Sequence, residues 1–212
     1  MSVGCPGVSG GVDLVLFDLG GVLVELAGVA TMRELAGLGD DQELWTRWLS
    51  CPWVSRFERG ECSAPEFASG VVSDWALGIP PAEFLDLFGA WPVAPFDGAE
   101  DLVESVRAVA TVGCLSNTNA MHWDSHFSRW PLLKAFDEVF LSYRLGLVKP
   151  DPAIFERVAQ MQSLDPARIL FLDDNTINTD AARRSGFRAH RVEGPAEARV
   201  ALAEEGVLPS GR

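Results

Sequence analysis

The sequence lacks the features of several protein classes. No apolar run among its 212 residues approaches the length that is needed to cross a bilayer. The N-terminal stretch MSVGCPGVSGG has neither the basic start nor the apolar centre of a signal peptide, so we expect a cytoplasmic protein. Basic residues are few, because 17 Lys and Arg stand against 30 Asp and Glu. The resulting net charge of −13 disfavours binding to nucleic acid and to anionic membranes.

Cysteine is also scarce. The four cysteines form no Cys-x-x-Cys pair and have no histidine nearby at zinc-finger spacing; they are Cys5, Cys51, Cys62 and Cys114. We therefore expect free thiols. Cys114 stands in an apolar stretch, which favours a place in the core.

Short apolar runs alternate with helical segments along most of the chain. Runs rich in β-forming residues predict strands at 12–17, 109–115, 139–141, 169–172 and 187–192. Helical spacing of apolar residues predicts helices at 99–108, 153–162 and 178–185. This alternation is typical of an α/β fold with a doubly wound parallel sheet and right-handed crossovers.

Residues 27–91 interrupt the alternation. They contain no convincing strand, but their spacing predicts helices at 29–37, 41–50, 64–77 and 81–88, with Asp40 and Ser63 as N-caps. We expect an α-helical insert between the first strand and the rest of the sheet. Large aromatic side chains usually stabilise by burial, so we interpret the five tryptophans of this segment as its packing core rather than a ligand platform: Trp45, Trp48, Trp53, Trp75 and Trp91.

Polar residues follow the predicted strands at the edge where ligands of open parallel sheets bind. Taken alone, each group could form a turn or a helix cap; the groups are Asp18, Ser116 with Asn117, Lys149, and Asp173 to Asn175. Together they offer carboxylate and carbonyl oxygens for Mg²⁺, and a hydroxyl, amides and an ammonium for a phosphate. Asp18 could then attack phosphorus in line.

Four motifs in order resemble the haloacid dehalogenase superfamily over almost the whole chain: FDLGGVL, LSNTN, VKPDPAIF and FLDDNTINTDAARRSG. The insert, with its stretch RFERGECSAPEF, is similar to the helical cap of the first cap class. Within the superfamily the sequence is most similar to the small sugar-phosphate phosphatases, especially the α-glucose-1-phosphate type. The resemblance implies a Rossmann-like core at 1–24 and 93–212 and a cap at 25–92.

The resemblance also implies a role for each motif residue. Asp18 would be the nucleophile, and the phosphoryl group would be bound by Ser116, Asn117 and Gly21. Lys149 would neutralise the charges of the nucleophile and of the phosphate, and would contribute to binding the phosphate. Mg²⁺ would be held by Asp18, by the carbonyl of Gly20 and by the acidic pair, with Asp174 as a direct ligand and Asp173 acting through water. The expected activity is Mg²⁺-dependent hydrolysis of a small phosphorylated metabolite, such as a sugar phosphate, by a monomer or homodimer.

Gly20 departs from the pattern of the superfamily. Most of its phosphatases carry a second aspartate there, which protonates the leaving oxygen and activates water, and loss of such a group costs about 10²- to 10⁴-fold in rate. One hypothesis is a leaving group that needs little protonation, such as an anomeric hydroxyl. A second is an acid from the cap, for which Glu58, Glu61 and Glu25 are candidates. A third is a weak or silent enzyme that binds a metabolite.

A fourth hypothesis is a 2-haloacid dehalogenase, which also lacks the second aspartate and binds its substrate through a cap arginine, here Arg47. The Asp173 and Asp174 pair favours phosphate chemistry instead, because it would crowd a metal-free site with negative charge. His122 and His126 share a helix face but lack a convincing third ligand, so we interpret them as structural, with His122 a minor candidate for the cleft. Two cap arginines either touch substrate or pair with Glu58 and Glu61; they are Arg56 and Arg59.

Overall fold

A five-stranded parallel sheet forms the centre of the molecule. The structure is a computed structural model that describes residues 11–209; the predicted free thiol Cys5 lies outside them. The sheet order is β5-β4-β1-β6-β7. Its strands are β1 (Leu14–Phe17), β4 (Thr111–Ser116), β5 (Glu138–Leu141), β6 (Ile169–Asp173) and β7 (Arg188–Arg191). The five strands lie at the predicted places, and the α/β Rossmann-like fold is confirmed.

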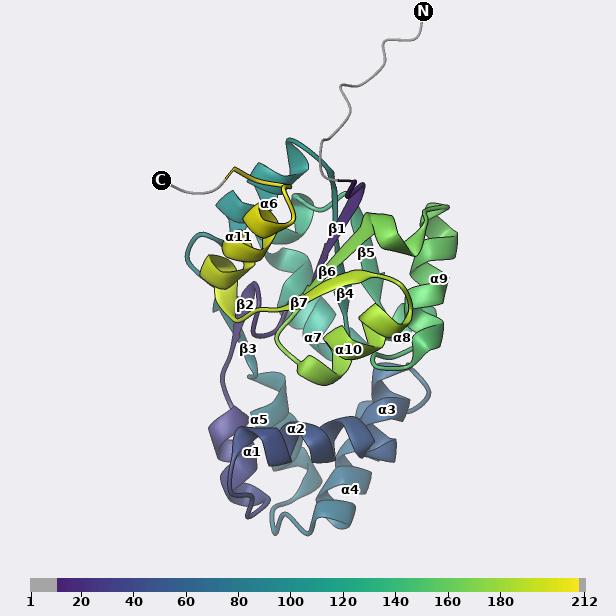
Figure 1. Cartoon of the computed structure of the whole chain (residues 1–212). Helices are drawn as coiled ribbons and strands as arrows, with labels where there is room; N and C mark the ends of the chain where they lie inside the picture. The colour runs from purple at the N-terminus through teal and green to yellow at the C-terminus, as the bar shows by residue number, and fades with distance from the viewer. Residues whose placement is uncertain (1–10, 210–212) are drawn as a thin grey trace, which may run out of the picture.

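Helices cover both faces of the sheet because the strands are apolar on both sides (Figure 1). In β1, Val15 and Phe17 face one hydrophobic cluster, while Leu14 and Leu16 face the other. The first cluster contains residues of α6 (Ala99–Arg107), α7 (Ala120–Ser125) and α11 (Gly194–Glu204). The second contains residues of α9 (Pro152–Gln162) and α10 (Thr176–Arg184). Shorter helices are α8 (Ser142–Leu145) and the 3-10 turns η1 (Phe127–Arg129), η2 (Pro131–Lys134) and η3 (Pro166–Arg168).

A group of five helices lies beyond the carboxyl ends of the strands (Figure 1). They are α1 (Val29–Leu35), α2 (Asp41–Ser50), α3 (Pro52–Glu58), α4 (Ala64–Trp75) and α5 (Pro81–Gly89). Both predicted N-caps are confirmed: Asp40 accepts a hydrogen bond from the Glu43 amide, and Ser63 forms a capping box with Glu66. Two antiparallel strands, β2 (Val24–Leu26) and β3 (Pro92–Pro95), connect this group to the sheet.

Aromatic side chains fill the interior of the helical group. Trp48 lies at its centre, with its ring centroid 4.9 Å from that of Trp91 and 6.0 Å from that of Trp75. These three tryptophans are buried, which confirms that they pack the interior, while Trp45 and Trp53 are partly buried at its margin. The helical group therefore has its own hydrophobic core, separate from the two clusters that flank the sheet.

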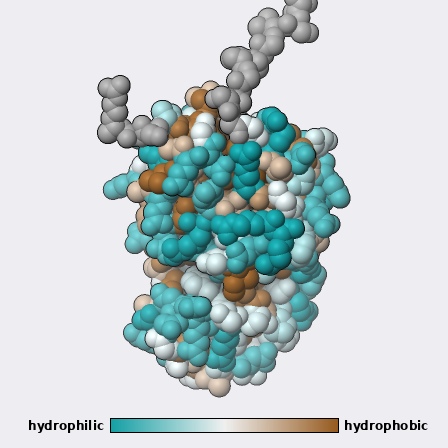
Figure 2. Space-filling view, viewed as in Figure 1, coloured by the Kyte–Doolittle hydropathy of each residue, from teal (hydrophilic) through white to brown (hydrophobic). Residues whose placement is uncertain are grey.

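The surface in the view of Figure 2 is mostly polar, and the described helices are short. Across the described residues, no helix combines the length and the hydrophobicity that a membrane span requires. Figure 2 shows a mostly hydrophilic face with a small hydrophobic patch between the sheet lobe and the helical lobe. The described cysteines are free, and Cys114 is buried in β4 as predicted.

Candidate active site

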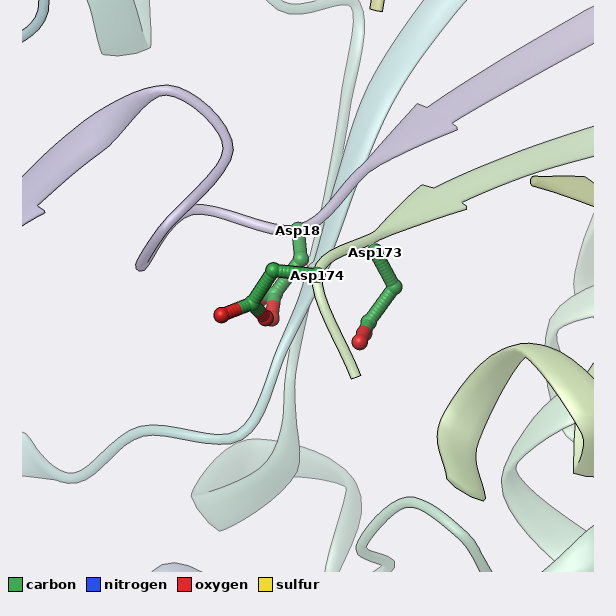
Figure 3. Close-up of side chains that lie close together, drawn as sticks. All are labelled: Asp18, Asp173 and Asp174. Carbon is green, nitrogen blue, oxygen red and sulfur yellow. The ribbon is translucent and has the colours of Figure 1, made fainter. Parts of the chain in front are cut away.

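The register of the sheet brings three acidic residues together. Phe17 at the end of β1 pairs with Leu172 in β6, so Asp18 and Asp173 are the next residues of neighbouring strands. The Asp18 amide donates to the Leu172 carbonyl at 2.8 Å. Carboxylate oxygens of Asp18, Asp173 and Asp174 all lie within 4.8 Å of one another (Figure 3). The predicted convergence of these side chains at one sheet edge is therefore present.

Lys149 lies between two of these carboxylates. Its Nζ atom is 2.6 Å from Asp173 Oδ2 and 3.1 Å from Asp18 Oδ2, and its side chain is fully buried. Burial acts to lower the pKa of Lys149, but the charges of Asp173 and Asp18 outweigh it and raise that pKa above its usual value. The ammonium group therefore stays charged and fixes both carboxylates.

Asp173 is surrounded by donors of the protein itself. Besides the Lys149 ammonium, its oxygens accept hydrogen bonds from Asn178 Nδ2 at 3.1 and 3.2 Å and from the Asn175 amide at 2.8 Å. The sequence analysis missed Asn178, although its place in the first turn of α10, five residues after Asp173, is the signal that could have found it. Asp173 thus anchors the lysine and the acidic loop.

Asp174, in contrast, lines a cavity between the sheet and the helical group. Its approach requires glycine at position 21, because a Cβ there would lie 2.3 Å from Asp174 Oδ2. Burial, together with the charges of Asp173 and Asp18, raises the pKa of Asp174 to about 8. Burial also raises the pKa of Asp18 to about 6, although Lys149 opposes the rise. The excess of buried negative charge over a single ammonium, on hard oxygen donors, fits a divalent cation such as Mg²⁺.

The loop after β4 provides the polar groups opposite these carboxylates. Ser116 is buried and lines the cavity. The side chain of Asn117 donates to the Lys149 carbonyl and accepts from the Lys149 amide, both at 2.9 Å. It therefore positions Lys149, and it also hydrogen-bonds to the Glu58 carboxyl. Thr118, which the sequence analysis did not single out, also lines the cavity, and its buried Oγ1 has no hydrogen-bond partner among the described residues.

Helical-group residues form the opposite wall of the cavity, whose volume is about 110 Å³. Trp45, Trp48 and Trp91 contribute to this wall, so the interpretation of the tryptophans as packing alone was incomplete. Glu58, the last residue of α3, also lines the cavity. It is the only one of the three acid candidates that does so, because Glu25 and Glu61 are exposed outside it.

The two histidines bind the end of helix α5. His122 Nε2 lies 2.7 Å from the Phe88 carbonyl, and His126 Nε2 lies 2.9 Å from the Gly89 carbonyl. Burial lowers the pKa of His122 to about 4, although its bond to Phe88 opposes the fall. His122 is therefore neutral at pH 7 and borders the cavity, and the structural interpretation of both histidines agrees with these contacts.

The arginines of the helical group do not line the cavity. Arg47 lies over the Trp75 ring at 4.4 Å from its centroid, so the structure does not support its predicted contact with a substrate carboxylate. Arg56 lies over the Trp53 ring, and Arg59 forms an ion pair with Asp151 at 3.4 Å. The expected pairing of Arg56 and Arg59 with Glu58 and Glu61 is likewise absent from the ion pairs of residues 11–209. Aromatic faces and Asp151 hold the guanidinium groups instead.

A carboxylate beside a buried ammonium, at the carboxyl ends of the strands of a doubly wound sheet, lies where α/β proteins of this architecture bind their ligands. Residues 12–186 match the family model of haloacid dehalogenase-like hydrolases. The chain belongs to this family.

The chain is also similar in sequence to proteins of known name. Acyl-CoA dehydrogenase family member 10 of Mus musculus is 31% identical over 192 residues, which are 85% of this chain but only 18% of that protein. D-ribitol-5-phosphate phosphatase of Bacteroides thetaiotaomicron is 28% identical over 200 residues, covering 89% of this chain and 95% of that enzyme. A haloacid dehalogenase family enzyme of B. thetaiotaomicron, solved with magnesium and inorganic phosphate, has a TM-score of 0.66 at 24% identity, covering 86% of this chain and 94% of its own. That structure shares the fold.

Proposed function

We propose that the protein is a Mg²⁺-dependent phosphatase that hydrolyses a small phosphorylated metabolite, in particular a sugar phosphate, through a phosphate ester of Asp18. The observation that carries the proposal is the Asp18 carboxylate, which lines the cavity at 3.1 Å from the Lys149 ammonium. The similarity to a D-ribitol-5-phosphate phosphatase over nearly its whole length supports the same substrate class.

All but one of the predicted site residues have a task in this reaction. Asp18 attacks phosphorus, and Lys149 reduces the repulsion between that carboxylate and the phosphate oxygens. Ser116, with backbone amides of the Asn117 loop, binds the phosphoryl group. Gly21, which was expected to bind it too, does not line the cavity, and its amide donates to the Val24 carbonyl at 2.9 Å. Magnesium would be held by Asp18, the Gly20 carbonyl and Asp174, and by Asp173 through water. When bound there, the ion would neutralise the charge that develops on the phosphoryl group.

The helical group acts as a cap over this site, with its boundaries at residues 25 and 92. The cavity of about 110 Å³ lies between the cap and the sheet and is walled by Trp45, Trp48 and Trp91. A space of that size excludes a macromolecule. Closure of such a cap also removes water from the reacting atoms.

Phosphate chemistry is favoured over dehalogenation. A haloacid needs a cationic partner for its carboxylate, and among the described residues that line the cavity there is no arginine. Lys149 is already shared by two carboxylates.

The test is phosphate release from an aryl phosphate and from a panel of sugar phosphates. We expect turnover with Mg²⁺, loss of turnover in EDTA, and no turnover by the Asp18→Asn variant, which keeps the shape of the side chain but removes its nucleophilic charge. Wild-type activity in Asp18→Asn would contradict the mechanism. Halide release from a chloroacid without metal would support the dehalogenase instead, and metabolite binding without turnover would support a silent binding protein.

A further inference from the structure

The site lacks a proton donor at residue 20, because glycine stands there. Leu26 occupies the space where one would stand: a Cβ at Gly20 would lie 2.7 Å from Leu26 Cδ1, the tip of a side chain that would have to turn aside. Leu26 comes from β2, at the start of the proposed cap, and lines the same cavity. An apolar side chain therefore occupies the place next to residue 20, and any acid must come from elsewhere.

Few described residues of the cavity can transfer a proton. Its titratable side chains are Asp18, Glu58, His122, Lys149 and Asp174. Asp18 is assigned to the attack on phosphorus and Asp174 to the metal. Lys149 is held in two ion pairs, and His122 is neutral with its Nε2 atom on a backbone carbonyl. Glu58 is the carboxyl group that has no other task.

Contacts between the cap and the sheet lobe fix the position of Glu58. The next residue, Arg59, forms its ion pair with Asp151 at the start of α9. Gly60 approaches the sheet lobe so closely that a Cβ there would lie 3.0 Å from the Tyr143 carbonyl oxygen, and its φ of +73° favours glycine. These contacts hold the end of α3 against the sheet lobe, so Glu58 faces the cavity from an anchored segment.

The surroundings of Glu58 suit proton transfer near neutral pH. Burial raises the pKa of this carboxyl to about 7, while hydrogen bonding to Trp48 and the charge of Lys149 oppose the rise and the charge of Asp18 adds to it. A carboxyl group with such a pKa is present in both protonation states at physiological pH, as a group that alternately donates and accepts a proton requires.

We propose that Glu58 is the general acid and general base of this enzyme, a proposal that rests on the phosphatase function proposed above. In the first step Asp18 Oδ bonds to phosphorus, the phosphorus–oxygen ester bond breaks, and the Glu58 carboxyl gives its proton to the leaving oxygen. In the second step Glu58 takes a proton from water, and the resulting hydroxide attacks phosphorus. The Asp18–phosphorus bond then breaks, so that phosphate, free Asp18 and protonated Glu58 result.

The experiment compares Glu58→Gln with Glu61→Gln, a matched variant of an exposed glutamate three residues away. Rapid-quench kinetics use p-nitrophenyl phosphate, whose leaving group needs little protonation, and the sugar phosphate that the wild type hydrolyses fastest. For Glu58→Gln we expect an unchanged first step with the aryl ester, visible as a burst of nitrophenol, and a steady state about 10²- to 10⁴-fold slower. With the sugar phosphate the first step itself should slow. Glu61→Gln should match the wild type.

The outcomes separate this proposal from the function on which it rests. If Glu58→Gln turns over both esters like Glu61→Gln, the assignment of Glu58 is wrong while the phosphatase function stands. If the wild type releases no phosphate from any ester with Mg²⁺, both fail. A Glu58→Ala variant provides a second measurement, because added formate should restore its second step when the missing carboxyl is catalytic, and no restoration would overturn the role.

Discussion

Removal of the Lys149 charge should destabilise the protein strongly. In Lys149→Met a side chain of similar length replaces the ammonium, which leaves Asp173 fully buried without its partner at 2.6 Å and Asp18 without its partner at 3.1 Å. Two opposite charges 4 Å apart attract by about 4 kcal/mol at an effective dielectric constant of 20. Breaking a buried pair from one side costs about 3–5 kcal/mol. Against a typical stability of about 5–15 kcal/mol, that loss is a large fraction.

Urea denaturation in EDTA, followed by circular dichroism, measures this loss. The exposed Lys134 is the chain's other lysine, and Lys134→Met is the control, with an expected change below about 0.5 kcal/mol. The double variant Lys149→Met with Asp173→Asn should recover part of the stability, since the buried carboxylate is then neutral. If the free energies of unfolding of Lys149→Met and Lys134→Met differ by less than about 1 kcal/mol, the ion pairs of Lys149 do not stabilise the fold and the reasoning is refuted.

Two further predictions concern pH and the site around residue 20. Since burial and, to a smaller extent, the charge of His126 lower the pKa of His122 to about 4, the unfolded state binds a proton first on acidification. The free energy of unfolding should fall by up to about 3 kcal/mol between pH 6.5 and 4, and urea melts of His122→Gln should lack this part of the loss. In the Glu58→Gln background, Gly20→Asp combined with Leu26→Ala should raise turnover at least about tenfold, because the new carboxyl group then has room beside Asp18. Gly20→Asp without Leu26→Ala should raise it less, since the Leu26 side chain must first turn aside. Equal turnover with and without the added aspartate would contradict the second prediction.

The sequence predicted the strands of the central sheet well, but it did not predict helix α11 or the short strands β2 and β3. Strands such as β6 are apolar on both faces, a pattern that is specific for the middle of a parallel sheet. Helix α11 was missed because alanine supplies much of its buried side, at Ala198 and Ala201, and alanine gives little contrast in hydrophobicity. Strands β2 and β3 were missed because they are three and four residues long, and β3 begins and ends with proline, which is uncommon in strands.

Helix ends could be predicted where a capping residue marks them. The start of α4 at Ala64 was predicted from the capping residue Ser63. Its end lies at Trp75 rather than two residues later, because Ala76 adopts a left-handed conformation with φ 52° that closes the helix. No property of alanine itself signals that conformation, because the left-handed region favours glycine and asparagine.

The candidate site divides in the same way. Residues at strand ends could be predicted to converge, because parallel strands bring their carboxyl ends to one edge, and Asp18 and Asp173 do meet there. Which residues of the proposed cap reach the site depends on how the core of the helical group packs against the sheet lobe, and no local sequence pattern predicts that packing. Arg47 therefore seemed available to a substrate but lies over Trp75, whereas Glu58 stood equal to two other glutamates until its contacts with the sheet lobe were known.

The proposed cap provides both the side chain that occupies the space beside residue 20 and the carboxyl group that we propose as the proton donor. Leu26 fills the space beside Gly20 from the first strand of the cap connection, and Glu58 enters the cavity from the end of α3. The sheet lobe alone then holds the proposed nucleophile and the proposed metal site but no carboxyl group free to donate a proton among the residues that line the cavity. An aspartyl ester formed there would meet the proposed general base only while the cap is docked. Because the docked cap also limits the entry of water, the arrangement that completes the proposed site is the one that excludes solvent.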